Sequence, residues 1–234
     1  CSTKRTCFCM AYSISLKMTK TNWITIDGTV MGEKGFLPAK LLELLIGRKS
    51  DLDVWAEEGY DKEVEEWQWV APEIITEMAI PYFNPEDNVL DAGCGTGLVG
   101  EILVKQGYTI DGIDLSPKML EYAKERGYRE LRSANLAQPS LADFIGKKYK
   151  SIISAGVYGD FINVNPWLSR LCDVLEENGT LAIAGSRYKL TEYKVFKYLE
   201  QNGLEVKEIR TGIGYFAEKQ DPIKCLYIIA QKTK

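Results

Sequence analysis

The sequence has no histidine, no long apolar run and no excess of positive charge. Without histidine, the commonest general base is missing, and Ser-His-Asp catalysis, Cys-His catalysis and histidine-ligated metal sites are excluded. We expect no metal site and, because no stretch of about 18 apolar residues occurs, no transmembrane helix. The 29 Lys and Arg are outnumbered by 33 Asp and Glu. This balance argues against a nucleic acid as the main partner, since phosphate binding needs clustered positive charge.

Paired cysteines are also missing, although the chain has six cysteines. No two of them have the CxxC spacing of a redox or zinc motif. Three lie within the first nine residues, and the others are scattered. We therefore expect reduced thiols in a cytoplasmic protein rather than a disulfide framework. The cysteines are Cys1, Cys7, Cys9, Cys94, Cys172 and Cys225.

The 234 residues suggest one domain with an extension. Residues 1–35 are predicted to form a flexible leader, and residues 36–86 an N-terminal helical lid. Within this lid, 36–47 are Leu-rich and helical in pattern, and Leu41 to Leu45 match an LxxLL partner-helix motif. A second helix is expected over 72–80. Residues 87–234 are predicted to form the core domain.

From residue 88 onward, short apolar strands alternate with segments of helical period. This alternation predicts an α/β fold, with a Rossmann-like, doubly wound parallel sheet covered by helices on both faces. The last two strands leave no room for a helix between them, so we expect the final strand to be antiparallel. The predicted strands are 88–92, 108–113, 130–134, 149–155, 180–184, 204–210 and 224–230.

The most informative segment is the glycine loop at 93–97, which follows the first predicted strand. Residues 95–100 fit the dinucleotide pattern GxGxxG, but the strand ends at Asp91, four residues too early for that motif. Asp91 would repel a pyrophosphate and attract a cation; two unit charges about 4 Å apart gain roughly 4 kcal/mol at an effective dielectric of about 20. S-adenosylmethionine (SAM) carries an ammonium and a sulfonium and no phosphate, so the sequence favours SAM over NAD.

Two further segments follow the next strands. Asp114 ends the second strand, where a carboxylate can accept hydrogen bonds from both ribose hydroxyls. Asn135 and Leu136 follow the third strand and are placed to meet the edge and face of an adenine. A ribose contact alone does not separate SAM from NAD.

The segments VLDAGCGTG and IDGIDLSPKML together resemble the class I SAM-dependent methyltransferase family over about residues 53–231. The resemblance implies a seven-stranded sheet with the last strand antiparallel and, position by position, a set of SAM contacts. Asn135 stands where the family often has Asp. The contacts that the resemblance implies are Asp91, Gly93, Gly95, Asp114, Leu115, Met119, Asn135, Leu136, Ser154 and Ala155.

The segment WAEEGYD at 55–61, with Ala71-Pro72 and GCGTGLVG, is similar to the Williams–Beuren-region methyltransferase-like proteins and related small-molecule enzymes. This narrower resemblance implies that Tyr60 lies in a helical lid and contacts SAM. Trp67 and Trp69 are expected to form the aromatic core of that lid.

A small molecule is the favoured methyl acceptor, and a protein side chain is the next candidate. If the acceptor must lose a proton, the candidate bases are Tyr158, Asp160 and Tyr188. Tyr158 and Arg187 are candidate substrate contacts, and the loop around Tyr215 is a candidate pocket wall. Two alternative functions stay open: an NAD-dependent oxidoreductase, and a non-catalytic SAM-binding protein that binds a partner through the Leu-rich helix.

Overall fold

The computed structural model describes residues 51–157, 164–187, 194–215 and 222–233. All of them belong to one compact unit, Lys49–Lys234. The predicted leader and the LxxLL segment lie outside the described residues. In the described part of the chain, no helix combines the length and apolar character needed to cross a membrane.

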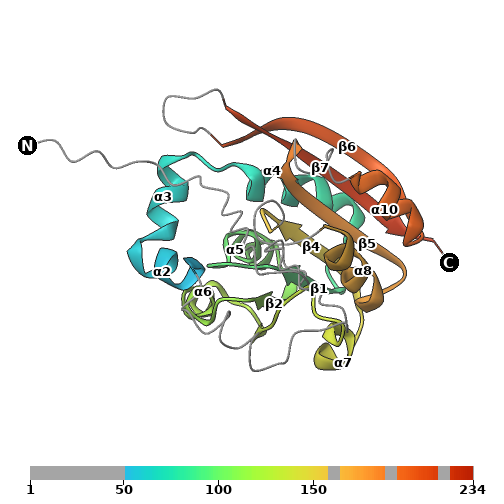
Figure 1. The fold of residues 1–234 in the computed structure, drawn as a ribbon, viewed down its shortest axis with the longest axis horizontal. Coiled ribbons are helices and arrows are strands. Elements are labelled where there is room, and N and C mark those ends of the chain that lie inside the picture. Colours follow the sequence, from blue (N-terminus) through green and yellow to red (C-terminus); the bar gives the residue numbers. More distant parts are fainter. Residues whose placement is uncertain (1–50, 158–163, 188–193, 216–221, 234) are drawn as a thin grey trace, which may run out of the picture. The chain divides into compact units, whose positions relative to one another are not determined.

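Seven strands form one sheet in the order β3-β2-β1-β4-β5-β7-β6 (Figure 1). β1, β2, β3, β4 and β5 pair in parallel, whereas β7 is antiparallel to both of its neighbours. The predicted strand count and the antiparallel last strand are therefore confirmed. The strands are β1 (Asn88–Ala92), β2 (Thr109–Asp114), β3 (Glu130–Ser133), β4 (Tyr149–Ala155), β5 (Leu175–Ser186), β6 (Leu204–Tyr215) and β7 (Ile223–Lys232).

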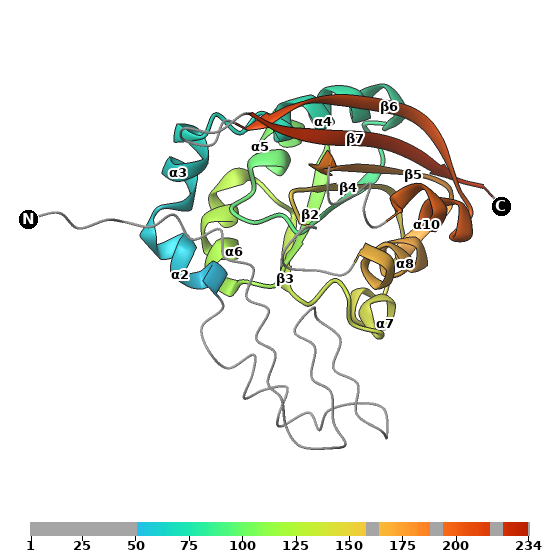
Figure 2. The ribbon, with the colours of Figure 1, turned by 45° about the horizontal axis from the view of Figure 1, so that its top comes forward.

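Helices cover both faces of the sheet, as Figure 2 shows most clearly for α8 and α10 beside β5 and β7. α4 and α5 pack on one face, and α7, α8 and α10 pack on the other. The described helices are α2 (Asp51–Glu58), α3 (Tyr60–Glu66), α4 (Ala71–Ala79), α5 (Leu98–Lys105), α6 (Pro117–Ala123), α7 (Leu141–Ile145), α8 (Val164–Val174) and α10 (Val195–Gln201), with 3-10 turns η1 (Ile80–Tyr82) and η2 (Lys124–Arg126).

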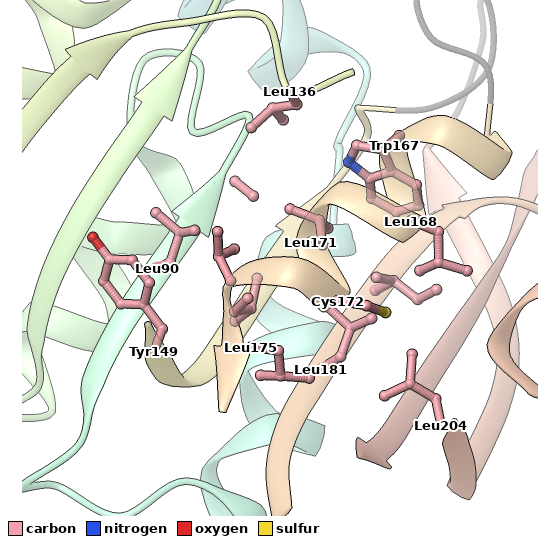
Figure 3. Close-up of a cluster of buried hydrophobic side chains, with 14 of the residues drawn as sticks. Leu90, Leu136, Tyr149, Trp167, Leu168, Leu171, Cys172, Leu175, Leu181 and Leu204 are labelled. Atoms are coloured by element: carbon pink, nitrogen blue, oxygen red, sulfur yellow. The ribbon is translucent and has the colours of Figure 1, made fainter. Parts of the chain in front are cut away.

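The two faces have separate hydrophobic cores, because successive strand residues point to opposite sides. Leu90, Ile152 and Leu181 join the core under α8 (Figure 3), whereas their neighbours Val89, Ile153 and Ala182 join the core under α4 and α5. Both sets are fully buried. The strand runs that read as continuously apolar in the sequence are therefore strands covered on both faces.

Three details differ from the sequence-based expectations. α4, predicted as part of the lid, packs on the sheet through Ile75 and Met78. β5 begins at Leu175 rather than residue 180; its pairing with β4 is irregular near Tyr149, and Asn178 adopts a positive φ of 55° there. The short helix α7 was not predicted, because five residues are too few to show a helical period.

Candidate functional site

A cavity of about 300 Å³ opens at the carboxyl ends of the central strands. Asp91 of β1, Asp114 of β2 and Ala155 of β4 line it from the sheet, and residues of α2 and α3 line it from the other side. The chain leaves β1 toward β2 on one side and returns to β4 on the other. Such a switch point is where doubly wound sheets bind ligands.

Ten of the eleven predicted cofactor contacts line this one cavity. Ser154 does not line it; the side chain is fully buried, and its hydroxyl donates a 2.5 Å hydrogen bond to the carbonyl of Ala92. Ser154 therefore ties β4 to the end of β1 beneath the cavity. The ten lining residues are Tyr60, Asp91, Gly93, Gly95, Asp114, Leu115, Met119, Asn135, Leu136 and Ala155.

The glycine loop is anchored to β2. The backbone N–H groups of Gly93 and Cys94 donate to the carbonyl of Ile113 at 2.7 and 3.0 Å. Gly93 has a φ of +80°, and a Cβ there would lie 2.0 Å from Cγ2 of Val157. A side chain at this position is excluded both by the backbone conformation and by the close approach of the β4 loop.

Asp91 is 1% exposed, yet it lines the cavity. Its Oδ2 accepts a 2.6 Å hydrogen bond from the Tyr128 hydroxyl. Burial raises the pKa of Asp91 to about 7, while the Tyr128 hydrogen bond acts in the opposite direction. A cationic ligand beside Asp91 would remove much of this penalty, because an opposite charge favours the ionised carboxylate.

Asp114 joins the end of β2 to the glycine loop. Its Oδ2 accepts from the N–H of Gly95 and its Oδ1 accepts from the N–H of Ser116, both at 2.9 Å. Burial raises the pKa of Asp114, and these backbone hydrogen bonds oppose the rise. Among the cavity-lining residues that the structure describes, none is Lys or Arg. The cavity thus presents two buried carboxyl groups without a basic side chain in its described wall.

The wall opposite the sheet is aromatic. Trp55 makes an edge contact with Tyr60 at a centroid distance of 4.6 Å and a tilted contact with Trp67 at 6.0 Å. Trp67 in turn lies 6.0 Å from the ring of Tyr215, at the end of β6. All four residues and Trp69 line the cavity. Trp67 and Trp69 therefore contribute to the cavity wall as well as to the packing of this region.

Two polar contacts hold this aromatic wall to the core. Asp61, next to Tyr60, accepts from Thr96 Oγ1 at 2.6 Å and from Arg126 Nη2 at 2.5 Å. Asp53 of α2 accepts from the hydroxyl of Ser116, which also caps α6 by accepting from the N–H of Met119 at 3.0 Å. α2 and α3 are thus attached to the loops that follow the two strands carrying the buried acids, and α3 is attached to η2 as well.

Only some of the residues predicted to contact or deprotonate the methyl acceptor lie in the part of the chain that the structure describes. Tyr158, Asp160 and Tyr188 lie outside the described residues. Arg187 follows β5 and is exposed, and it does not line the cavity. Tyr215 does line it, at the predicted wall.

Sequence reasoning missed Leu52, Val64 and Tyr128. The first two line the cavity, and Tyr128 does not line it but donates a hydrogen bond to Asp91. No motif marks Tyr128: it follows a 3-10 turn and a glycine, and its partner lies 37 residues earlier.

Comparison with known proteins adds the family. A family model described as "Methyltransferase domain" matches residues 83–231. The ribosomal protein L11 methyltransferase of Dictyoglomus thermophilum is 30% identical over 144 residues, covering 60% of this chain and 46% of that protein. The malonyl-[acyl-carrier protein] O-methyltransferase of Priestia megaterium is 28% identical over 124 residues, covering 52% and 45%.

The crystal structure of magnesium protoporphyrin IX methyltransferase from Synechocystis PCC 6803, solved with bound SAM, has the same fold. Its TM-score is 0.62 at 20% identity, and the match covers 85% of this chain and 99% of that one. This chain spans about half the length of the curated relatives it matches. Because the family model covers most of the chain, from before β1 to within β7, the chain belongs to the methyltransferase-domain family.

Proposed function

We propose that this protein is a SAM-dependent methyltransferase. The observation that carries the proposal is the pair of buried acids, Asp91 and Asp114, in a cavity whose described wall has no basic residue. A dinucleotide would bring a pyrophosphate to the same loop, where both carboxylates would repel it. Family membership and the wall's charge both favour SAM over the alternative of an NAD-dependent oxidoreductase.

The residues present fit SAM, part by part. Asp91 would bind the ammonium, with the loop at Gly93 and Gly95 beside the methionine chain. Asp114 would accept hydrogen bonds from the ribose hydroxyls while it keeps its two backbone donors. The adenine would lie among Leu115, Met119, Asn135 and Leu136, with Tyr60 closing the cavity and Ala155 under the sulfonium.

When bound, SAM supplies an already activated methyl group, so the protein's task is to position the acceptor and exclude water. Water would be excluded by the aromatic wall, which is formed by Trp55, Tyr60, Trp67 and Tyr215. The proposed candidates for a general base are Tyr158, Asp160 and Tyr188. The proposed substrate contacts are Tyr158 and Arg187.

We propose a small-molecule acceptor, with a protein side chain as the next candidate. The apolar, aromatic wall favours an acceptor with a flat or apolar surface. One relative is named a malonyl-[acyl-carrier protein] O-methyltransferase and another a ubiquinone biosynthesis O-methyltransferase, and the second name supports a small-molecule acceptor. The L11 methyltransferase is named for a protein acceptor.

Two narrower proposals rest mainly on the sequence. The WAEEGYD segment supports a place among the Williams–Beuren-region methyltransferase-like proteins. The cysteine pattern supports a cytoplasmic location; the described cysteines Cys94, Cys172 and Cys225 are buried free thiols, and burial raises the pKa of each.

Calorimetric titration with SAM, S-adenosylhomocysteine (SAH) and NAD tests the cofactor assignment. Saturable binding of SAM and SAH, with no heat from NAD, is the expected result. Binding of NAD alone would overturn the proposal. A screen with methyl-labelled SAM against metabolite, protein and RNA pools then identifies the acceptor; SAM binding without label transfer to any pool would favour the non-catalytic alternative.

A further inference from the structure

Tyr128 lies in a slot bordered by three glycines. A Cβ added to Gly100 of α5 would lie 2.2 Å from the Tyr128 hydroxyl oxygen, and one on Gly97 or Gly112 would lie 2.8 or 2.9 Å from its ring carbons. A larger residue at Gly100 would thus occupy the position of the phenol. Since the ring fills this slot, the hydroxyl has a defined position.

That position brings the hydroxyl within hydrogen-bond distance of Asp91. The hydrogen bond to Oδ2 is 2.6 Å long, a length typical of a hydroxyl donating to a carboxylate. Tyr128 does not line the cavity, whereas Asp91 does. Tyr128 is therefore joined to the cavity wall by its hydrogen bond to Asp91.

We propose that Tyr128 is a positioning residue for the cofactor site: its hydroxyl favours the ionised form of the Asp91 carboxyl group and orients it to receive the ligand's ammonium group. The inference rests on the proposed function, because it assigns the ammonium of SAM or SAH to Asp91. It explains why a tyrosine outside the cavity is fitted so closely between the glycine loop, α5 and β2.

The charges around Asp91 support this role. The titratable groups that face it are Tyr128, Cys94 of the glycine loop and Asp114 of β2. Burial raises the pKa values of Tyr128 and Cys94, so both stay neutral near pH 7. Burial also raises the pKa of Asp91 to about 7, and the Tyr128 hydrogen bond limits the rise. Without the hydroxyl, Asp91 would hold its proton to higher pH.

Ligand binding is coupled to the release of a proton from Asp91. Below the pKa of Asp91, the ligand's ammonium displaces the carboxyl proton, which passes to the buffer. With Tyr128→Phe, more of the free protein carries this proton at pH 7, so more must be released and apparent affinity falls. As the pH rises above the Asp91 pKa in both proteins, Asp91 becomes ionised in each, and the difference between their affinities for the ligand narrows.

The test compares SAH with 5′-methylthioadenosine, which keeps the adenosine part but has no amino-acid group. Tyr128→Phe is expected to weaken SAH binding about 5- to 10-fold at pH 7 and less than about 2-fold at pH 8.5. Affinity for methylthioadenosine should change less than about 2-fold at either pH. Calorimetry in buffers of different ionisation enthalpy should show more proton release on SAH binding by the variant.

A double-mutant cycle checks that Tyr128 acts through Asp91. In an Asp91→Asn background, Tyr128→Phe is expected to leave SAH affinity unchanged. Three results would overturn the inference. Tyr128→Phe could weaken the binding of SAH and methylthioadenosine equally, or weaken SAH binding by the same factor at both pH values. It could also weaken SAH binding in the Asp91→Asn background as much as in the wild type. If the wild-type protein binds neither compound, the proposed function itself fails, which is a distinct outcome.

Should Tyr128→Phe fail to fold, as judged by circular dichroism, the wild-type protein and Asp91→Asn supply the test. SAH affinity should then rise with pH around 7 in the wild type and lose this dependence in Asp91→Asn. A wild-type profile that is flat around pH 7 would overturn the inference.

Discussion

Asp91 shows how a binding residue can lower the stability of the free protein. Burial raises its pKa from 3.8 to about 7. Between these values the folded state holds a proton that the unfolded chain has released, so this residue's contribution to stability falls as pH rises from about 4 to 7. The cost of ionisation is offset only when a cation binds.

We therefore expect Asp91→Asn to stabilise the free protein at pH 8 by about 1 to 4 kcal/mol, since a shift of one pKa unit corresponds to about 1.4 kcal/mol. At pH 4, where both residues are neutral, the two proteins should have nearly equal stability. Urea unfolding at the two pH values measures this. The account would be contradicted if the two proteins differed in free energy of unfolding by the same amount at both pH values, or if the variant were less stable at pH 8.

Asp114 is expected to contribute to ribose binding. Asp114→Ala should weaken SAH and methylthioadenosine alike, by about 1 to 3 kcal/mol, because the ribose is common to both. It should also lower thermal stability, since the N–H groups of Gly95 and Ser116 lose their acceptor. Unchanged affinity for both compounds in calorimetry would remove Asp114 from the site.

The sequence revealed the buried acids but not the residue behind one of them. Asp91 and Asp114 each lie within one residue of the end of a strand, beside a glycine loop or a helix cap, and such positions can be predicted from the local sequence pattern. Tyr128 reaches Asp91 through tertiary packing against Gly97, Gly100 and Gly112, which no local pattern encodes. For Ser154, position was readable, but the direction of its side chain was not.

At the scale of elements, α3 is held to the glycine loop by a polar bridge. Arg126 and Thr96 both bond to Asp61, and the Arg126 side chain is only 18% exposed. Tyr60 adjoins Asp61, so the bridge keeps this ring over the cavity. The bridge is part-buried, and we expect it to matter more than a surface ion pair.

Arg126→Met is accordingly expected to speed hydrogen exchange in α3 and to weaken SAH about 3- to 10-fold, a loss of about 1 kcal/mol. Lys62→Met is the matched control, because Lys62 pairs with Glu66 on the same helix at 3.8 Å and both side chains are largely exposed. This control should change neither property measurably. Similar hydrogen-exchange rates in α3 of the two variants would show that the polar bridge at Asp61 does not hold this helix.

Strand and helix order from residue 88 was readable because period-two and period-3.6 patterns alternate there. Strand lengths were less so: β5, β6 and β7 extend beyond the predicted limits. Several of their extra residues, such as Glu176 and Thr211, are polar and exposed. Sheet pairing, which begins at Leu175 in β5 and includes Thr211 in β6, makes these segments strands, rather than an apolar pattern.

At the scale of the whole molecule, strand order places the site. β1 lies between β2 and β4, so the loops after these three strands meet at one edge. The acids, the glycine loop and the β4 loop converge there although they span residues 91–157 of the sequence. The alternation of strands and helices predicts the fold, and the fold in turn predicts where the ligand binds.

The most direct test of the central claim is a crystal structure with SAH. We expect the ammonium within about 3 Å of the Asp91 carboxylate and the ribose hydroxyls within about 3 Å of Asp114. The adenine should lie against Leu115 and Leu136. SAH bound elsewhere, or with its ammonium turned away from Asp91, would contradict the account.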